Sequence, residues 1–322
     1  MQLAMVGDIG GTHARFGLVD VSDTIVEIEA PQTLLCSDFT SLERAVDHYL
    51  HDRGLESHPL CAAIAVAGPV TDGATVFTNM AWTVSETDLR AAGFPHALLL
   101  NDYEALASAA PLLTEAHAHM VGPLREQNPN KTVAVLGAGT GFGVSALIRN
   151  DGREAVMATE GGHIAFAPCD ALEIEILRNL AVRFGRVSIE RILSGPGLFI
   201  LYCAMCEIAG RPKACSSPAE VSAQAMAGDV AAREAVERFC GILGATAGDF
   251  ALAYGAQGGV YIAGGVAPRL LSLLEAGSFR ERFEAKGRFG GYLSAIPTGV
   301  ITHPYLALLG AARRVQMHDF GR

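Results

Sequence analysis

The chain has 322 residues, half of them hydrophobic and 18% charged, so it is long and apolar enough to bury the cores of two domains. Its formal net charge is −10 and no run is rich in Lys and Arg, which argues against nucleic-acid binding through phosphate neutralisation. The N-terminus lacks the basic region of a signal peptide, and the longest apolar stretch, Leu243–Val266, contains Asp249 and Gln257, so no membrane association is expected. Seven cysteines with a single CxxC, at Cys203 and Cys206, are typical of reduced thiols in a cytoplasmic protein.

The first part of the chain alternates apolar runs with helix-capping patterns. A continuous apolar run such as Cys61–Ala67 suits a strand buried on both faces, and Ser85 with Asp88 forms a capping-box pattern. This alternation indicates an α/β fold with mixed strand directions. In chain order we expect strands at 3–7, 15–21, Thr24–Gln32, Cys61–Ala67 and Ala97–Leu100, and helices from Ser37-Asp38 through His51, from Ser85 to Gly93, and from Tyr103 to Ala110.

The same order then begins again. A second strand pair is followed by helices with Asp or Ser at the N-cap, a long helix and one more buried strand. Two α/β halves that each open with a strand hairpin predict a duplicated fold with a cleft between the halves. The expected elements are strands at Lys131–Leu136, Phe142–Ile148 and Gly259–Ala263, helices after Asp170 and Ser217, and a helix at Val236–Tyr254.

Two glycine-rich loops join the strands of the two predicted hairpins, Gly7-Asp8-Ile9-Gly10-Gly11-Thr12 and Gly137-Ala138-Gly139-Thr140-Gly141. Glycine lets successive backbone N–H groups approach an anion, and Thr adds a hydroxyl donor, so both loops suit phosphate groups. The carboxylate of Asp8 would repel phosphate unless Mg²⁺ lies between them, directly or through water. The alternative is that both loops are ordinary tight turns.

A polar pair, Asn101-Asp102, follows a buried strand directly. Ligands of open α/β sheets bind beyond the carboxyl ends of the strands, so Asp102 could accept a proton from an attacking hydroxyl while Asn101 holds a neighbouring one. The alternative is a helix N-cap, which position alone favours because Asn and Asp are common capping residues.

Three further segments carry candidate residues. In Glu160-Gly161-Gly162-His163 the glycines argue against a helix, so the pair offers an acceptor and a donor to a polyhydroxylated ligand in a loop. Glu190 lies between apolar residues, and its alternative is a surface carboxylate paired with Arg191. Gly264-Gly265 follows a buried strand and leaves room for a flat group on the backbone, or forms a simple turn into a helix that Pro268 opens.

Together and in this order, these motifs resemble those of the bacterial glucokinase family of the non-ROK type, in the actin/hexokinase/Hsp70-like ATPase superfamily. The resemblance runs over nearly the whole chain and implies two RNase H-like α/β domains with mixed sheets around a central cleft. It implies a small domain of residues 1–111 with 303–322, to which the last helix, His303–Phe320, returns, and a large domain of 112–302. The ROK branch carries a Cys-rich zinc motif where this chain has only Cys169, so no structural zinc is expected.

The resemblance also implies ATP-dependent phosphorylation of glucose at its 6-hydroxyl, with Asp102 as the base, Asp8 near Mg²⁺, and a homodimer. One departure is His13, where the family often has Asn. The implied ATP ligands are Gly7, Asp8, Ile9, Gly10, Gly11, Thr12, Gly137, Gly139, Thr140 and Gly141 toward the phosphates and Gly264 and Gly265 toward the adenosine. The implied glucose ligands are Asn101, Asp102, Glu160, His163 and Glu190.

Other functions remain open. A kinase of another hexose or of an N-acetylhexosamine would use similar sugar contacts. A non-catalytic sugar-responsive regulator usually adds a DNA-binding segment, whereas the first strand here starts near Leu3. A filament-forming or chaperone-like ATPase would lack the Asn-Asp and Glu-x-x-His pairs, and its ATP turnover would not depend on a sugar.

Overall fold

The computed structural model describes residues 3–317 apart from 23–25, 56–58, 60, 78–81, 124 and 126. The chain divides into two compact units, the first made of Met1–Leu113 with Pro304–Arg322 and the second of Thr114–His303. The domain limits expected from the sequence, 1–111 with 303–322 and 112–302, stay a prediction. Both units are mixed α/β bodies, as expected, and each is described by itself below.

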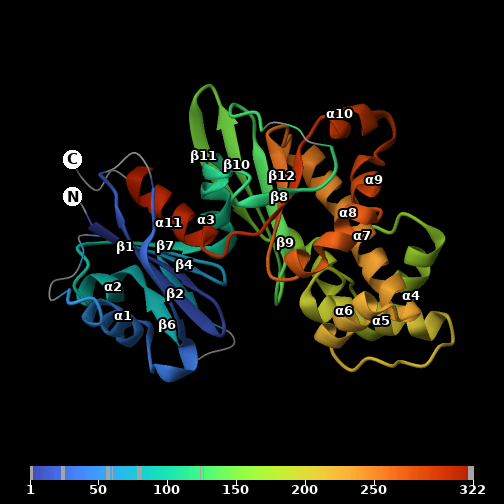
Figure 1. The fold of residues 1–322 in the computed structure, drawn as a ribbon, viewed down its shortest axis with the longest axis horizontal. Coiled ribbons are helices and arrows are strands. Elements are labelled where there is room, and N and C mark those ends of the chain that lie inside the picture. The colour runs from blue at the N-terminus through green and yellow to red at the C-terminus, as the bar shows by residue number, and fades with distance from the viewer. Residues whose placement is uncertain are drawn as a thin grey trace. The chain divides into compact units, whose positions relative to one another are not determined.

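The first unit is built on a five-stranded sheet of order β3-β2-β1-β4-β7. The hairpin of β1 and β2 and the neighbouring β3 are antiparallel, whereas β1, β4 and β7 are parallel. All six residues of β4 are buried, as the continuous apolar run predicts for a central strand. The strands are β1 (Leu3–Ile9), β2 (His13–Asp20), β3 (Glu29–Leu35), β4 (Cys61–Val66) and β7 (His96–Asn101) (Figure 1).

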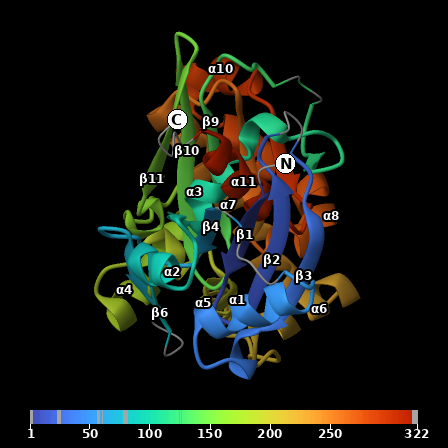
Figure 2. The same cartoon turned by 90° about the vertical axis from the view of Figure 1, so that its left-hand side faces the viewer.

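Helices cover both faces of this sheet, α1 (Leu42–His51) and α2 (Glu86–Ala91) on one and α3 (Asp102–Ser108) and α11 (Leu306–Met317) on the other (Figure 2). A small hairpin, β5 (Ala74–Val76) and β6 (Thr83–Ser85), and the 3₁₀ turns η1 (Cys36–Asp38) and η2 (Ala110–Leu112) complete the unit. Helix α11 lies directly on α3, because a side chain at Gly310 would overlap the backbone carbonyl of Ala105. Residues near the end of the chain therefore help to fix the helix that starts at Asp102.

The second unit has a six-stranded sheet of order β11-β10-β9-β12-β13-β8. It repeats the arrangement of the first sheet: three antiparallel strands, then two that run parallel to the first strand of the hairpin. Strand β8 adds an antiparallel edge. The strands are β8 (Ala118–Met120), β9 (Val133–Ala138), β10 (Phe142–Asn150), β11 (Arg153–Thr159), β12 (Gly259–Ala263) and β13 (Thr298–Ile301).

The core of the second unit lies around α7, a helix of 25 residues. Gly244 lets α7 pack closely on α9, because a side chain there would overlap the carbonyl of Phe279. Within the described residues, neither α7 nor any other helix has the length and apolarity needed to span a bilayer. The helices are α4 (Ala171–Phe184), α5 (Gly195–Ile208), α6 (Pro218–Ala227), α7 (Val230–Tyr254), α8 (Leu271–Ala276), α9 (Phe279–Glu284) and α10 (Gly290–Ser294).

Several element limits predicted from the sequence were wrong. The third strand is Glu29–Leu35, where the chain pairs with β2, and Thr24 of the predicted strand lies outside the described residues. The first helix begins at Leu42, because Ser41 accepts a hydrogen bond from the Arg44 N–H and acts as the N-cap, while the expected cap at Ser37-Asp38 lies in η1.

The two later long helices also differ from their predicted limits. Helix α7 starts at Val230, since Asp229 caps it, and not at Val236. Helix α11 spans Leu306–Met317 and so starts after His303, while the last residues of the predicted helix, 318–320, lie outside the described part of the chain. Each shift follows from a cap or a break that competes with the hydrophobic pattern.

Candidate functional site

The first glycine-rich loop is a hairpin turn between β1 and β2, as the sequence predicts. The Gly10 N–H donates to the carbonyl of His13 at 2.9 Å and closes the turn. Gly11 and Thr12 at its tip are exposed, so their backbone N–H groups are open to a ligand, whereas the Thr12 carbonyl accepts from the Cys36 N–H at 2.9 Å. Asp8 precedes the turn on β1, opposite Arg15 on β2, and Arg15 Nη1 donates to Asp8 Oδ2 at 2.9 Å.

The Arg15–Asp8 pair was missed by the sequence reasoning. Burial raises the pKa of the Asp8 carboxyl above its ordinary value, and the charge and hydrogen bond of Arg15 oppose that rise. The strand register pairs Asp8 with Arg15 across the hairpin, so counting outward from the Gly10-Gly11-Thr12 turn could have found the partner. Arg15 therefore helps to keep Asp8 negatively charged at this loop.

Asn101 is the N-cap of α3, so the alternative interpretation of this residue is correct. Its Oδ1 accepts from the N–H groups of Tyr103 at 3.0 Å and Glu104 at 3.3 Å. Its Nδ2 donates to the carbonyl of Gly68 at 3.0 Å, which ties the end of β7 to the loop after β4. Capping fixes the Asn101 side chain in one orientation, next to the carboxyl of Asp102.

Asp102 is the first residue of α3, and its Oδ1 accepts from the Tyr103 N–H at 2.9 Å. Burial and the negative charge of Asp8 raise the pKa of the Asp102 carboxyl to about 7. The two carboxylates interact because Asp8 lies on β1 and Asp102 follows β7, the two neighbours of β4. A carboxyl group that titrates near neutral pH is suited to accept a proton during a reaction.

The pair of carboxylates also provides a test of the expected Mg²⁺. Burial of Asp8 and its repulsion of Asp102 both favour a bound cation, and carboxylate oxygens are ligands that Mg²⁺ prefers. Among the described residues, no three His, Cys, Asp or Glu side chains gather as a metal-binding group. The residues thus fit an ion that takes one or two carboxylates and completes its shell with phosphate oxygens and water, which is how Mg²⁺ is usually bound.

The second glycine-rich loop is also a hairpin turn, between β9 and β10. The Gly139 N–H donates to the Gly141 carbonyl at 2.8 Å. A side chain at Gly137 would overlap the carbonyl of Ala263, and one at Gly264 would overlap that of Ala138. The loop and the Gly264-Gly265 turn, expected at phosphates and adenosine respectively, are therefore in backbone contact.

The Gly264-Gly265 turn has two different glycines. Gly264 has a φ of 84° and no space for a side chain, whereas a Cβ at Gly265 would meet nothing within 4 Å. Only Gly265 thus leaves the open backbone surface that the sequence reasoning assigned to both. The turn leads into a 3₁₀ helix, Ala267–Leu270, with Pro268 in its first positions, so the simple-turn interpretation also holds.

Glu190 lies in the 3₁₀ turn Ile189–Arg191 and contacts the second loop. Its Oε2 accepts from the Phe142 N–H at 2.8 Å. The expected alternative, a pair with Arg191, is wrong, because the Arg191 guanidinium lies 4.6 Å from the ring centroid of Phe184. A residue predicted to bind sugar and a loop predicted to bind phosphate are therefore hydrogen-bonded to each other.

Glu160 precedes a single 3₁₀ turn, Gly161–His163, and His163 is its last residue, where the sequence predicts a loop without helix. The glycines allow this turn to lie on β10, because a side chain at Gly162 would overlap the carbonyl of Phe142. The side chains of Glu160 and His163 are 70% and 60% exposed, and Glu160 Oε2 lies 3.8 Å from His163 Nε2. Both side chains are thus open to a ligand with hydroxyl groups.

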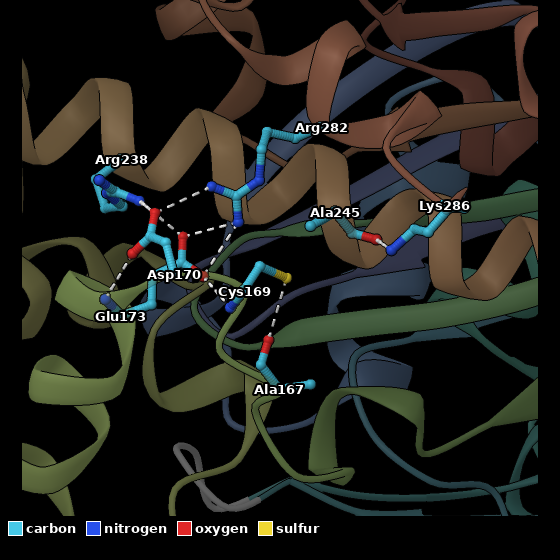
Figure 3. Close-up of polar contacts among 8 residues, drawn as sticks. All are labelled: Ala167, Cys169, Asp170, Glu173, Arg238, Ala245, Arg282 and Lys286. Carbon is cyan, nitrogen blue, oxygen red and sulfur yellow. Dashed lines mark hydrogen bonds and ion pairs between the residues drawn. The ribbon is translucent and has the colours of Figure 1, made fainter. Parts of the chain in front are cut away.

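A separate polar cluster joins α4, α7 and α9 (Figure 3). Glu173 is completely buried, and its Oε1 accepts from Arg238 at 2.9 Å and from Arg282 at 2.8 Å. Asp170 pairs with the same two arginines. A cavity of about 230 Å³ beside Glu173 has a mainly apolar lining, which offers few partners to a sugar or a nucleotide. We therefore interpret this cluster as structural, because its ion pairs connect α4, α7 and α9.

Comparisons with known proteins agree with one another. A family model described as Glucokinase matches residues 5–318. The chain is 51% identical over 321 residues to a glucokinase of Caulobacter sp. (strain K31), covering 99% of this chain and 96% of that protein. It is 43% identical to a glucokinase of Hahella chejuensis, covering 99% and 98%. The crystal structure of a glucokinase from an Antarctic psychrotroph matches with a TM-score of 0.90 at 36% identity, covering 99% of this chain and all 100% of that one.

Proposed function

Because this chain belongs to the glucokinase family, we propose that it transfers the γ-phosphoryl group of ATP to the 6-hydroxyl of glucose, giving glucose 6-phosphate and ADP. The observation that carries the proposal is the buried carboxyl of Asp102, at the carboxyl end of a parallel strand, with its pKa raised to about 7. Phosphoryl transfer depends mainly on positioning and on charge neutralisation, with one base to accept the hydroxyl proton.

The proposed sugar ligands are side chains that accept or donate single hydrogen bonds. Glucose is neutral and rich in hydroxyls, so carboxylates, an amide and an imidazole suit it better than cations. Asn101 keeps a fixed orientation because it caps α3 and donates to the Gly68 carbonyl, and Glu190 is held by the Phe142 N–H. Both side chains are therefore oriented before a ligand binds. The full proposed set is Asn101, Asp102, Glu160, His163 and Glu190.

In the proposed reaction, Asp102 accepts the proton of the 6-hydroxyl while that oxygen forms a bond to the γ-phosphorus of ATP. The bond from the γ-phosphorus to the bridging oxygen breaks, and the electron pair leaves on ADP. Only the ionised form of Asp102 can accept this proton. The reaction should therefore require Asp102 to lose its own proton, which happens above about pH 7.

The proposed phosphate ligands are backbone N–H groups and the Thr hydroxyls at the tips of the two hairpins, Gly11-Thr12 and Thr140-Gly141. Other residues expected there from the sequence lie in paired strands, Gly7, Asp8 and Ile9 in β1 and Gly137 in β9, and so support these tips. Gly265 offers its open backbone surface to the adenosine, while Gly264 allows the turn to lie against the loop. Mg²⁺ would be held by Asp8, directly or through water, and by phosphate oxygens. When bound, it supplies positive charge that offsets the charge of the transferred group.

We also propose a homodimer, a cytoplasmic location and a two-domain organisation for this chain. A homodimer is supported by the family resemblance alone. A cytoplasmic location is supported by seven free cysteines, because disulfides are rare in the cytosol. The domain limits 1–111 with 303–322 and 112–302 are supported by the repeated sheet order of the two units.

The experiment that tests the proposal measures ADP release from Mg-ATP with and without glucose. We expect turnover that depends on glucose, and sugar-independent hydrolysis would contradict the kinase proposal. A panel of mannose, fructose and N-acetylglucosamine under the same conditions separates a glucokinase from a kinase of another hexose. Absence of turnover with every sugar, together with measurable sugar binding, would favour the non-catalytic regulator.

A further inference from the structure

The second glycine-rich loop is fastened to the segment that carries Glu190 at two places. At one, the Phe142 N–H donates to Glu190 Oε2 at 2.8 Å. At the other, the Gly195 N–H donates to the carbonyl of Gly139 at 2.8 Å. These bonds hold both sides of the Gly139–Gly141 turn, so the turn and the carboxylate of Glu190 form one unit.

The carboxylate itself is held at its base as well as at its tip. Ser194, the N-cap of α5, donates its hydroxyl hydrogen to the backbone carbonyl of Glu190 at 2.8 Å. Within the described residues, Oε2 takes the Phe142 N–H, and Oε1 receives no hydrogen bond. One carboxylate oxygen is thus used to fix the side chain, and the other is left for a ligand hydroxyl.

The two glycines of the turn have different surroundings. A Cβ at Gly141 would lie 2.5 Å from Glu190 Oε2 and 3.4 Å from its Cδ, whereas a Cβ at Gly139 would meet nothing within 4 Å. Neither glycine has a positive φ, so the backbone accepts alanine at both positions. The absence of a side chain at Gly141 is therefore what lets the Glu190 carboxylate reach the Phe142 N–H.

We infer that Gly141, although part of the phosphate loop, is a positioning residue for the sugar, acting through Glu190. The inference rests on the proposed function, in which Glu190 binds glucose hydroxyls. A methyl group at position 141 would lie 2.5 Å from Glu190 Oε2, which is too close, so the carboxylate would have to move away from the Phe142 N–H. Hydrogen bonds to hydroxyls are directional, so a shift of about 1 Å is expected to weaken sugar binding strongly.

The test compares Gly141→Ala with Gly139→Ala, two alanines in the same turn. We expect Gly141→Ala to raise the KM for glucose by roughly 10- to 100-fold, with a much smaller change in the KM for ATP. Gly139→Ala should leave the KM for glucose near the wild-type value, whatever it does to the KM for ATP. Equal values of the glucose KM in the two variants would overturn the inference.

A double-mutant cycle decides whether Gly141 acts through Glu190. In a Glu190→Ala background the clash is removed, so adding Gly141→Ala should raise the glucose KM by less than about 2-fold. Fully additive effects would show that Gly141 acts by another route. Glu190→Gln retains an oxygen that accepts from Phe142, so Gly141→Ala should keep its effect in that background.

A measurement without turnover separates this inference from the proposed function. The amide proton of Phe142 should shift in NMR spectra when Glu190→Ala is introduced into the wild-type chain or into Gly139→Ala. It should shift much less when Glu190→Ala is introduced into Gly141→Ala, in which the hydrogen bond to Glu190 is already lost. An equal shift on introducing Glu190→Ala into the wild type and into Gly141→Ala would overturn the inference while glucose phosphorylation stands. If the variants show this pattern of shifts and the wild-type chain shows no glucose-dependent turnover, the result would instead contradict the proposed function.

Discussion

The negative charge of Asp8 adds to the effect of burial on Asp102, and together they raise the pKa of the Asp102 carboxyl to about 7. Asp8 does so although it is paired with Arg15 at 2.9 Å, because the Arg15 side chain is 35% exposed and solvent screens part of its charge. Because Asp8 contributes to the raised pKa of Asp102, removing the charge of Asp8 should change the pH at which the enzyme gains activity.

We predict that kcat/KM for glucose falls below about pH 7 with the loss of one ionised group. If Asp102 is that group, the acid limb of the Asp8→Asn variant should move to lower pH, because removal of a nearby negative charge lowers the pKa of Asp102. The measurement is a pH profile of kcat/KM for both proteins, normalised to each plateau so that lower activity of the variant does not matter. An acid limb at the same pH in both would contradict the assignment of Asp102.

Asp102→Asn should fold and lose turnover by roughly 10²- to 10⁴-fold, the usual loss on removal of a general base. The same variant should gain stability at high pH. The folded-state pKa of Asp102 lies above its unfolded value of 3.8. The contribution of Asp102 to the free energy of unfolding is therefore fully present below pH 3.8 and is lost as pH rises through about 7.

At pH 8 the free energy of unfolding of Asp102→Asn should thus exceed that of the wild type by about 1–3 kcal/mol, with the difference shrinking toward pH 4. Urea denaturation at both pH values measures it. Turnover near the wild-type rate, or a variant less stable than wild type at pH 8, would count against the role and the surroundings given to Asp102.

Glu173→Gln should destabilise the second unit by about 3–5 kcal/mol, because it leaves the Arg238 and Arg282 charges without their buried partner. The matched control is Glu237→Gln, which removes a pair with Arg233 whose side chains are 53% and 46% exposed, and should cost less than about 1 kcal/mol. Thermal unfolding measures both. The KM for glucose should not change in either folded variant. A rise in this KM in Glu173→Gln alone would mean that the cluster affects the residues proposed to bind the sugar.

Gly264→Ala should raise the KM for ATP or prevent stable folding, since Gly264 has a φ of 84° and lies against the carbonyl of Ala138. Gly265→Ala adds a methyl group where nothing lies within 4 Å, so it should retain the wild-type free energy of unfolding. Its effect on the KM for ATP then reports whether the open surface is used by the nucleotide. Comparable destabilisation by both substitutions would contradict the different environments of the two glycines.

Local chemistry explains which parts of the fold could be predicted from the sequence. The hairpin turns and the caps at Ser85, Asp170 and Ser217 depend on neighbours within four residues, and they were found. Where two candidate caps compete, as Ser37 and Ser41 do, the sequence pattern does not decide, because the hydrophobic face of the helix selects between them.

The candidate site was only partly accessible to such reasoning. The residue types at positions 101, 102 and 190 indicated polar ligands, but their partners lie far along the chain: Gly68 for Asn101 and Phe142 for Glu190. The pKa of Asp102 depends on burial under the sheet edge and on Asp8, which no spacing in the sequence encodes. These contacts arise from tertiary packing, and only a structure supplies them.

The close packing of α11 on α3 has a consequence for how the chain acquires its fold. The second unit is continuous, from Thr114 to His303, whereas the first needs residues that follow it. As the chain emerges from a ribosome, the second unit can complete its core first. The face of the first sheet that α11 covers, with Val6 and Leu100, must wait in contact with water or a chaperone until Leu306–Met317 arrive.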